Sequence, residues 1–322
     1  MNVKSVKFQH LLQSLKRKLF GFNFVDGLVY RTFVYILLIA VSYVFLYPLI
    51  KMFSMALMSK ADIINPEVQW IPKSLSFENI KVAIKVLDVP KTLVNSFWLS
   101  ALFAIAQTIV SALTGYAFAQ FKFKFKKLWF GMVLASFIIP VPIVLIPRIM
   151  MFTSLQDLLS IKIIGSIIPQ LALSLLGQGV YSAILILIFY NFFKLIPTVL
   201  DEAARIDGAN AWQVFWNIFV KMSLSTILTV FLFSFVWNWN ETYITSTFVR
   251  SSVQLLPMKL GAFDSLFESV TGSMPQGGGG ARLNEAYKMA GTLIAVLPLL
   301  IIYAFVQKRF VEGIENTGIT GE

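Results

Sequence analysis

The residues best suited to contact a partner lie in a polar segment, residues 194–221, between two hydrophobic stretches. Within it Glu202 and Arg205 are three positions apart, so on a helix they share one face and can pair with each other or address a partner. Ala203 and Ala204 lie between them, and their small side chains allow another surface to approach the backbone closely. This combination predicts a docking element for a soluble partner; a simple connector at the membrane surface is the alternative.

Capping signals divide this segment into two helices. Thr198 is followed three positions later by Asp201, which resembles a capping box and predicts a helix from Val199 to Asp207. Gly208 then predicts the end of that helix, because glycine adopts the left-handed conformation without steric cost. A second capping signature restarts a helix that leads back to the membrane, with Asn210 and Gln213 three positions apart. The expected structure is a short helix–turn–helix lying across one end of a helical bundle.

A second group of polar and aromatic residues stands at the end of a hydrophobic stretch, in the sequence WNWNE. On a helix Asn238 and Glu241 share a face, and Trp237 lies four positions before Glu241. Amide and carboxylate acceptors beside an aromatic face suit the hydroxyl groups and rings of sugars, and polar groups at membrane depth usually face a cavity or a partner. The alternative is an interfacial belt with tryptophan at the headgroup level. We expect Asn238 to face a pathway and Trp239 to belong to the belt.

Several kinds of chemistry are excluded by composition. The chain has no cysteine and a single histidine, His10. Disulfides, thiolate metal sites, cysteine nucleophiles and clustered histidine ligands are therefore ruled out. The run from Gly277 to Gly280 is not followed by the Lys-Ser or Lys-Thr of a phosphate-binding loop. We interpret it as a flexible hinge or loop tip rather than a ligand site.

Hydropathy defines the elements that must position these groups. Hydrophobic residues make up 57% of the chain and charged residues only 13%, against about 25% charged residues in a typical soluble domain. Roughly 20 helical residues cross the hydrocarbon core of a bilayer, and backbone groups in lipid must pair internally. The sequence therefore predicts an all-α membrane protein with six transmembrane helices, at Thr32–Ile50, Thr92–Phe121, Leu128–Pro147, Ile163–Phe193, Met222–Asn240 and Met289–Gln307.

The charge distribution gives the expected topology. Basic residues gather in the N-terminal segment and in residues 122–127, which places both termini in the cytoplasm by the positive-inside rule. Apolar residues at helical spacing between Phe8 and Leu15 predict an amphipathic helix on the membrane surface, with a simple cytoplasmic leader as the alternative. The expected divisions are a basic cytoplasmic segment at 1–31, a six-helix domain at 32–307 with outer loops at 58–91 and 250–287, and a cytoplasmic tail at 308–322.

The polar segment also carries a family resemblance. Its sequence EAARIDGANAWQVF, with Gly208 after the EAA of residues 202–204 and Ile218 beyond, resembles the EAA loop of the integral-membrane subunits of bacterial ABC importers. It is similar to carbohydrate importers of the maltose permease class, in particular their MalG-like subunits. The likeness runs from the first hydrophobic stretch to the C-terminus, through FSFVWNWNE and AGTLIAVLPLLIIYAFVQKRFVEGI. One departure is Lys221, where the family usually has proline, and it predicts a straighter return of the helix to the membrane.

The resemblance implies a division of labour between subunits. This chain would be a non-catalytic permease subunit of the bacterial cell membrane, forming half of the translocation pathway beside a second permease subunit in a heterodimer. Two ATPase subunits would bind ATP and magnesium, and an extracytoplasmic binding protein would deliver a sugar or oligosaccharide. The residues expected to couple to the ATPase are Glu202, Ala203, Ala204, Arg205, Asp207, Gly208 and Trp212, and the expected pathway residues are Trp237, Asn238 and Glu241.

The same resemblance gives roles to two further segments. The outer loop at 250–287 would contact the docked binding protein, and the tail, expected to be extended after Arg309, would reach the interface between the ATPase subunits. This division agrees with the absence from the sequence of a GxxxxGK[ST] motif and of an acidic cluster for magnesium.

Three other functions share parts of this pattern. A permease for a non-sugar solute would keep the same coupling loop. A passive channel or an ion-coupled carrier would need no docking loop, and it often shows internal repeats or more buried charges. A structural membrane scaffold would show no ATP-linked phenotype when Gly208 is altered.

Overall fold

The computed structural model describes residues 27–250, 252–272 and 277–316, and the regular structure in these residues is helical, apart from an isolated bridge between Met58 and Leu75. Contacts divide the chain into two compact units. Of the described residues, the smaller unit holds 27–80 with 277–293, and the larger holds 81–250 and 252–272 with 294–316. The amphipathic helix predicted near the N-terminus lies outside the described residues.

The described residues contain four helices that are long and apolar enough to cross a membrane, or up to six spans if each of two bent helix pairs counts as one. This agrees with the predicted all-α fold. The long helices are α2 (Leu28–Leu57), α5 (Val89–Gln120), α7 (Val141–Leu159) and the residues Gly280–Gln307 of α16 (Gly277–Asn316). The bent pairs are α9 (Ser182–Leu195) with α10 (Thr198–Ile206), and Ala211–Val220 with α12 (Leu224–Asn240).

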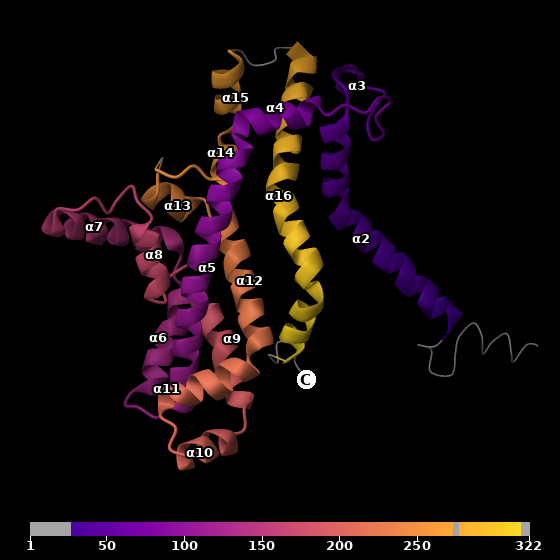
Figure 1. Cartoon of the computed structure of the whole chain (residues 1–322). Helices are drawn as coiled ribbons and strands as arrows, with labels where there is room; N and C mark the ends of the chain where they lie inside the picture. The colour runs from indigo at the N-terminus through magenta and orange to yellow at the C-terminus, as the bar shows by residue number, and fades with distance from the viewer. Residues whose placement is uncertain (1–26, 251, 273–276, 317–322) are drawn as a thin grey trace, which may run out of the picture. The chain divides into compact units, whose positions relative to one another are not determined.

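The third and fourth hydrophobic stretches are each divided between two helices. The third is interrupted between α6 (Lys126–Ile138) and α7, because Pro140 lacks an N–H and takes an extended conformation. Figure 1 shows that α7 runs sideways, away from the lines of α5 and α6. The fourth is divided between α8 (Ile168–Leu175) and α9, joined by a linker in which Gly177 has a φ of +71°. These breaks create the irregular backbone that surrounds a cavity described below.

The larger unit is built on α5, which packs along both α9 and α12 (Figure 1). At Gly115 the helices α5 and α9 approach so closely that a Cβ would lie 2.6 Å from the Cβ of Phe189 and 3.0 Å from the backbone nitrogen of Tyr190. Only glycine fits at this crossing. The shorter helices of the unit are α11 (Ala211–Val214), the π-helix Phe215–Val220, α13 (Tyr243–Phe248), α14 (Leu256–Gly261) and α15 (Phe263–Thr271).

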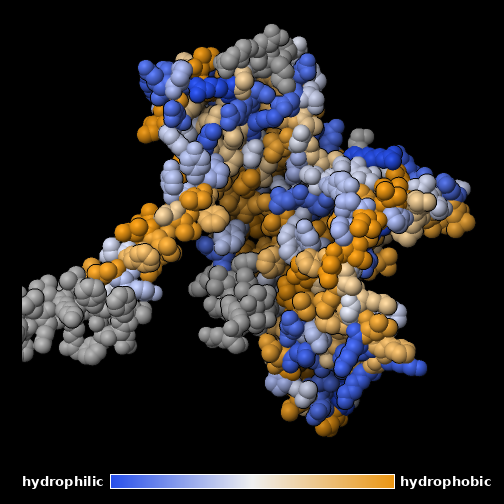
Figure 2. Space-filling view, turned by 180° about the vertical axis from the view of Figure 1, so that it is seen from behind, coloured by the Kyte–Doolittle hydropathy of each residue, from blue (hydrophilic) through white to orange (hydrophobic). Residues whose placement is uncertain are grey.

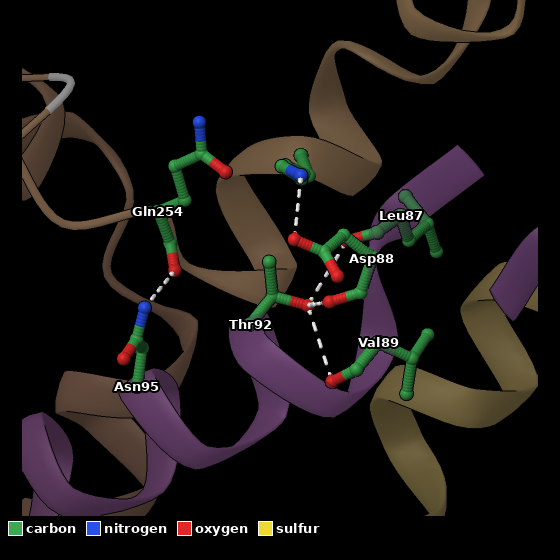
Figure 3. Close-up of polar contacts among 7 residues, drawn as sticks. Leu87, Asp88, Val89, Thr92, Asn95 and Gln254 are labelled. Carbon is green, nitrogen blue, oxygen red and sulfur yellow. Dashed lines mark hydrogen bonds and ion pairs between the residues drawn. The ribbon is translucent and has the colours of Figure 1, made fainter. Parts of the chain in front are cut away.

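The first turn of α5 is held by the polar contacts in Figure 3. Asp88 precedes the helix in the left-handed conformation, and the hydroxyl of Thr92 donates to its carbonyl oxygen at 3.0 Å. The Asn95 amide donates to the carbonyl oxygen of Gln254 at 3.1 Å. The Ser96 hydroxyl accepts from the first backbone N–H of α14 at 2.8 Å. The chain that follows Arg250 is thus tied to this end of α5.

The smaller unit joins the end of α2 to residues 277–293 of α16. Helix α3 (Lys60–Ile64) follows α2, and α4 (Glu78–Leu87) begins at the end of the unit. Asn79 is buried, and its amide caps α2 by donating to the carbonyl oxygen of Met55 at 3.0 Å. Asp62 accepts from the backbone N–H of Ser74 at 3.0 Å. This bond is the main reason that the pKa of Asp62 is lowered, although burial opposes it.

Two expectations about irregular segments are wrong. The run from Gly277 to Gly280, predicted as a hinge or loop tip, forms the first turn of α16. The same helix continues past Arg309 to Asn316, where the sequence predicts an extended tail. Both segments adjoin a long apolar helix, and adding residues to an existing helix is far easier than nucleating a new one. Residues 317–322 lie outside the described part.

Candidate functional site

The segment at residues 194–221 folds as the predicted helix–turn–helix and turns away from the spans beside it. Helix α10 is bent by 74° from α9, and Ala211–Val220 is bent by 85° from α12. In Figure 1, α10 and α11 lie at the opposite end of α5 from α14 and α15. Ser96, which bonds to α14, and Tyr116, which bonds to α11, are 20 positions apart on α5. At about 1.5 Å per residue they are about 30 Å apart, the thickness of a hydrocarbon core.

The turn between the two helices is a Schellman motif at Gly208, which has a φ of +85°. The Gly208 N–H donates to the carbonyl oxygen of Arg205 at 3.1 Å, and the Ala209 N–H donates to that of Ala204 at 2.9 Å. These bonds satisfy carbonyl groups that the end of a helix leaves unpaired. Asn210 then starts α11 with a complete capping box. The predicted left-handed turn and second cap are therefore confirmed.

Tyr116 anchors the second half of the segment to α5. Its hydroxyl donates to the carbonyl oxygen of Ala211 at 3.3 Å, and its ring centroid lies 5.0 Å from that of Phe215 and 4.8 Å from that of Phe219. The three rings are buried. The straighter return predicted from Lys221 is wrong, because these buried contacts hold the π-helix across the bundle and the chain turns by 85° without proline.

The charged residues of α10 pair differently from the expectation. Arg205 binds Asp201, four positions earlier, with 2.9 Å between Nε and Oδ2. Within the described residues Glu202 takes part in no ion pair. The cap predicted at Thr198 is also absent, because Thr198 is the first helical residue and Arg205 occupies the carboxylate of Asp201. Of the residues predicted to couple, Ala204 is half-buried and the others are exposed, namely Glu202, Ala203, Arg205, Asp207, Gly208 and Trp212.

The predicted coupling residues omit the apolar surface of this segment. Helix α10 is amphipathic, yet none of its residues is buried. Its apolar side chains recur at helical spacing, and large hydrophobic side chains are exposed around it: Leu195, Val199, Leu200, Ile206, Trp212 and Trp216. Figure 2 shows hydrophobic and hydrophilic residues side by side over this end. The sequence signal for this apolar surface was the helical spacing of apolar residues at positions 199, 203 and 206. An amphipathic face that its own chain leaves uncovered is typical of a docking surface.

A second candidate site is a cavity of about 400 Å³ in the larger unit, between α6, α7, the α8–α9 linker and the end of α12. Trp237 and Glu241, two of the three predicted pathway residues, line it. The ring of Trp237 meets that of Tyr181 edge-on, with 5.0 Å between centroids. Arg148, from α7, also lines the cavity and donates from Nη2 to Oε1 of Gln178 at 3.2 Å.

Asn238 does not line this cavity. It is 4% exposed, and its amide donates to Oε1 of Gln107 at 2.9 Å and to the carbonyl oxygen of Ser234 at 2.8 Å. Gln107 is fully buried and also contacts the Ser182 hydroxyl at 3.5 Å. These polar contacts join α5, α9 and α12 behind the cavity. Trp239, predicted for the interfacial belt, is also buried, at 3% exposure.

Glu241 organises the backbone beside the cavity. Its Oε1 accepts from the N–H groups of Tyr243 and Ile244, and its Oε2 from the N–H of Thr245, all at 2.9 Å. The Thr245 hydroxyl lies 3.2 Å from Oε2 and 3.1 Å from Oε1 of Gln170. Glu241 therefore caps the first turn of α13, and the Thr245 hydroxyl links that helix to α8.

Arg148, Gln178 and Tyr181 were not predicted from the sequence. Gln178 and Tyr181 lie together in the α8–α9 linker, but Arg148 is 30 positions before Gln178, so no local spacing relates it to them; the available signal was an arginine directly after a hydrophobic stretch. As for metals, the described residues contain no group of three histidine, cysteine, aspartate or glutamate side chains that could hold an ion.

This architecture, several apolar helices with an amphipathic helix–turn–helix exposed at one end, is that of a multi-pass membrane protein. A family model narrows the class of membrane protein. The chain belongs to the family of binding-protein-dependent transport system inner membrane components, which matches residues 107–316. The predicted family is thereby confirmed, and the chain is a transport component of the membrane.

Curated relatives cover most of the chain. The lactose transport system permease protein LacG of Rhizobium radiobacter is 28% identical over 74% of this chain and 78% of that protein. The sn-glycerol-3-phosphate transport system permease protein UgpE of Yersinia pestis is 25% identical over 88% of this chain and 96% of that protein. The probable starch degradation products transport system permease protein AmyC of Thermoanaerobacterium thermosulfurigenes is 28% identical over 76% of this chain and 81% of that protein.

A solved structure has the same fold. It is that of a bacterial ABC transporter involved in the import of the acidic polysaccharide alginate, with a TM-score of 0.66. The match covers 96% of this chain and 99% of that chain at 18% sequence identity.

Proposed function

We propose that this chain is a permease subunit of an ATP-driven importer for a sugar or oligosaccharide, in which it forms half of the translocation pathway. Membership of the binding-protein-dependent family supports the importer class. Relatives named for lactose and for starch degradation products support a sugar over an unrelated solute. A second permease subunit, in a heterodimer, would supply the other half of the pathway.

The observation that carries this proposal is the uncovered apolar face of α10. Val199 and Ile206 share that face and are 67% and 85% exposed. Burying a hydrophobic side chain of this size contributes about 1.5–3 kcal/mol. A soluble ATPase subunit with a matching cleft would cover the face and would hold the ATP and magnesium, while this chain remains non-catalytic.

The contacts of Tyr116 would pass a movement of the docked segment on to the membrane domain. Because Tyr116 fixes Ala211 to α5, closure of an ATPase pair beneath α10 and α11 would tilt α5 with them. The two ends of α5 are about one hydrocarbon thickness apart. With the docking segment and both termini in the cytoplasm, α14 and the residues after Arg250 would face the other side, where a binding protein delivers the solute. The C-terminal tail would reach the ATPase interface.

Charge reversal at Glu202 tests the docking. Glu202 is exposed and in no ion pair within the described residues, so Glu202→Lys leaves the internal contacts of α10 intact. We expect less ATPase to co-purify with the permease and weaker substrate-stimulated hydrolysis in proteoliposomes. Asp201→Asn is the matched control: it breaks the exposed pair with Arg205, a contact worth about 0.2–1 kcal/mol, and should leave association nearly normal.

A second variant removes the apolar contribution. Ile206→Asp places a charge on the exposed face of α10 without disturbing a buried contact, since Ile206 is 85% exposed. We expect it to abolish co-purification while the permease still inserts in the membrane. Normal association of both Glu202→Lys and Ile206→Asp would show that this segment does not dock an ATPase.

A further inference from the structure

The cavity beside Trp237 is lined by one guanidinium, that of Arg148, and by one carboxylate, that of Glu241. Arg148 lies half-buried in its lining, and the hydrogen bond that holds it goes to the neutral side chain of Gln178, at 3.2 Å. Within the described part of the chain, no ion pair includes Arg148. A charged group in a membrane-spanning segment is costly and usually serves a ligand or a pathway. The guanidinium is therefore available to an anionic ligand.

Glu241 lines the same cavity, but its carboxylate is engaged by the backbone. Its two carboxylate oxygens accept three backbone N–H groups at 2.9 Å and lie 3.2 Å from the Thr245 hydroxyl. The three N–H groups fill most of the roughly four acceptor positions of a carboxylate, and the Thr245 hydroxyl shares its one proton between Glu241 and Gln170. Breaking the N–H contacts to reach Arg148 would unpair the first turn of α13. The carboxylate is thus fixed by the backbone, whereas the guanidinium is held by one hydrogen bond to a neutral amide.

Aromatic side chains also line the cavity, and one of them, Tyr181, has a strained backbone conformation. Tyr181 has a φ of +51°, a conformation that costs a residue with a Cβ about 1–2 kcal/mol. Non-glycine residues persist in this conformation where surrounding structure fixes them, and such residues cluster at ligand sites. The ring centroid of Tyr181 lies 5.0 Å from that of Trp237 and 6.2 Å from that of Phe137, and both pairs meet edge-on. Flat rings with a polar edge suit the faces and hydroxyl groups of a sugar.

We propose that this cavity binds the anionic group of a hydroxylated solute, either a sugar acid or a sugar or polyol phosphate. Arg148 is the counter-charge, and Tyr181 with Trp237 forms the stacking wall. The volume of about 400 Å³ falls within the range of roughly 300–1,000 Å³ typical of small-molecule sites. A planar guanidinium matches two oxygens of a carboxylate or phosphate, and Gln178 holds it in place through Nη2. The inference rests on the proposed importer function and names the substrate class of its pathway.

A lipid headgroup phosphate offers Arg148 the same chemistry, so the experiment must separate the two sources. The natural chain has no cysteine, so a single cysteine introduced at Ser136, in the cavity lining, reports on the cavity alone. The full chain with its partner subunits is placed in phosphatidylcholine nanodiscs and labelled with neutral N-ethylmaleimide, and labelling of this chain is read after its separation on a denaturing gel. Digalacturonate and glycerol 3-phosphate serve as anionic probes, and maltose as the neutral probe.

We expect the anionic probes to slow the labelling of Ser136→Cys at concentrations at least about tenfold lower than maltose. Adding Arg148→Gln should remove that preference, with each labelling rate measured relative to that of the same variant without probe. Arg148→Lys should retain part of the preference, because the charge stays and the planar geometry is lost. Arg31→Gln, which removes the same charge from an exposed position of α2, is the matched control and should change nothing.

Three results would overturn the inference. Equal protection by maltose and the anionic probes, unaffected by Arg148→Gln, would mean a neutral substrate and would leave the importer function intact. Protection by phosphatidylglycerol in the nanodisc, with no further effect of the anionic probes, would assign Arg148 to lipid. No protection by any probe would mean that the cavity is not a solute site, whatever Glu202→Lys does to ATPase docking.

Discussion

Substitution of Gly208 tests whether the angle between α10 and α11 controls docking. Gly208 has a φ of +85°, and no atom lies within 4 Å of a Cβ built on it. A side chain at this position therefore meets no neighbour, and its whole cost is in the backbone. The series Gly208→Asn, Gly208→Ala and Gly208→Val raises that cost stepwise, because asparagine tolerates the left-handed conformation best and a β-branched residue worst.

The size of the effect follows from the left-handed conformation. It costs alanine about 1–2 kcal/mol, and about 1.4 kcal/mol changes an equilibrium constant tenfold. If docking requires the turn seen here, the apparent Kd for the ATPase should rise about 5–30-fold in Gly208→Ala. Asparagine should cost less and valine more. Gly208→Pro should abolish docking, because proline cannot reach this φ and lacks the N–H that donates to Arg205.

The assay titrates the ATPase subunit against the permease complex in nanodiscs, with membrane insertion measured in parallel. Gly131→Ala is the matched control: Gly131 lies within α6, and a Cβ there also meets nothing within 4 Å, but its φ is not positive. That variant should bind normally, since alanine is favoured over glycine in a helix by about 0.5–1 kcal/mol. Equal affinity across the Gly208 series would refute the reasoning, because the turn would then have no influence on docking.

The other predictions concern packing, coupling and pH. Gly115→Ala should lower stability by about 1–3 kcal/mol, measured as the thermal unfolding of the solubilised protein, because its Cβ overlaps α9 at 2.6 Å. Tyr116→Phe removes the bond to Ala211, worth about 0.5–1.5 kcal/mol, and should lower substrate-stimulated hydrolysis more than ATPase co-purification. The pKa of Asp62 is lowered from 3.8, so its stabilisation of the Ser74 amide should be complete above that pH and lost as pH falls through the folded value. Hydrogen exchange of that amide, corrected for intrinsic rate, should show this, and Asp62→Asn should remove the pH dependence.

Local signals made the docking segment predictable. The turn at Gly208 and the cap at Asn210 depend on residues within a few positions of one another, and both are present. The same reasoning failed at Thr198, where two local partners competed. Arg205 lies one helical turn after Asp201 and takes its carboxylate, so the capping box does not form. Spacing identifies candidate pairs, but several pairs can share one side chain.

The cavity was only partly predictable, because its contacts cross between helices. Treating positions 237–241 as one continuous helix placed Asn238 and Glu241 on one face. The helix in fact ends at Asn240, so Glu241 caps the next helix while Asn238 turns inward to Gln107. Gln107 is 131 positions away in the sequence. No periodicity in the sequence could predict a contact between Asn238 and Gln107 over that separation.

Helix α5 supplies a physical route between the two candidate sites. Tyr116 contacts the docking segment, and Gln107 lies nine positions earlier on the same helix, about 14 Å away. Gln107 fills the space behind the cavity so closely that a Cβ at Gly179, in the cavity lining, would lie 1.9 Å from its Nε2. A displacement that Tyr116 passes to α5 would therefore press directly on the cavity wall through Gln107. The coupling would use one rigid helix, with a packed tyrosine at one contact and a buried glutamine at the other.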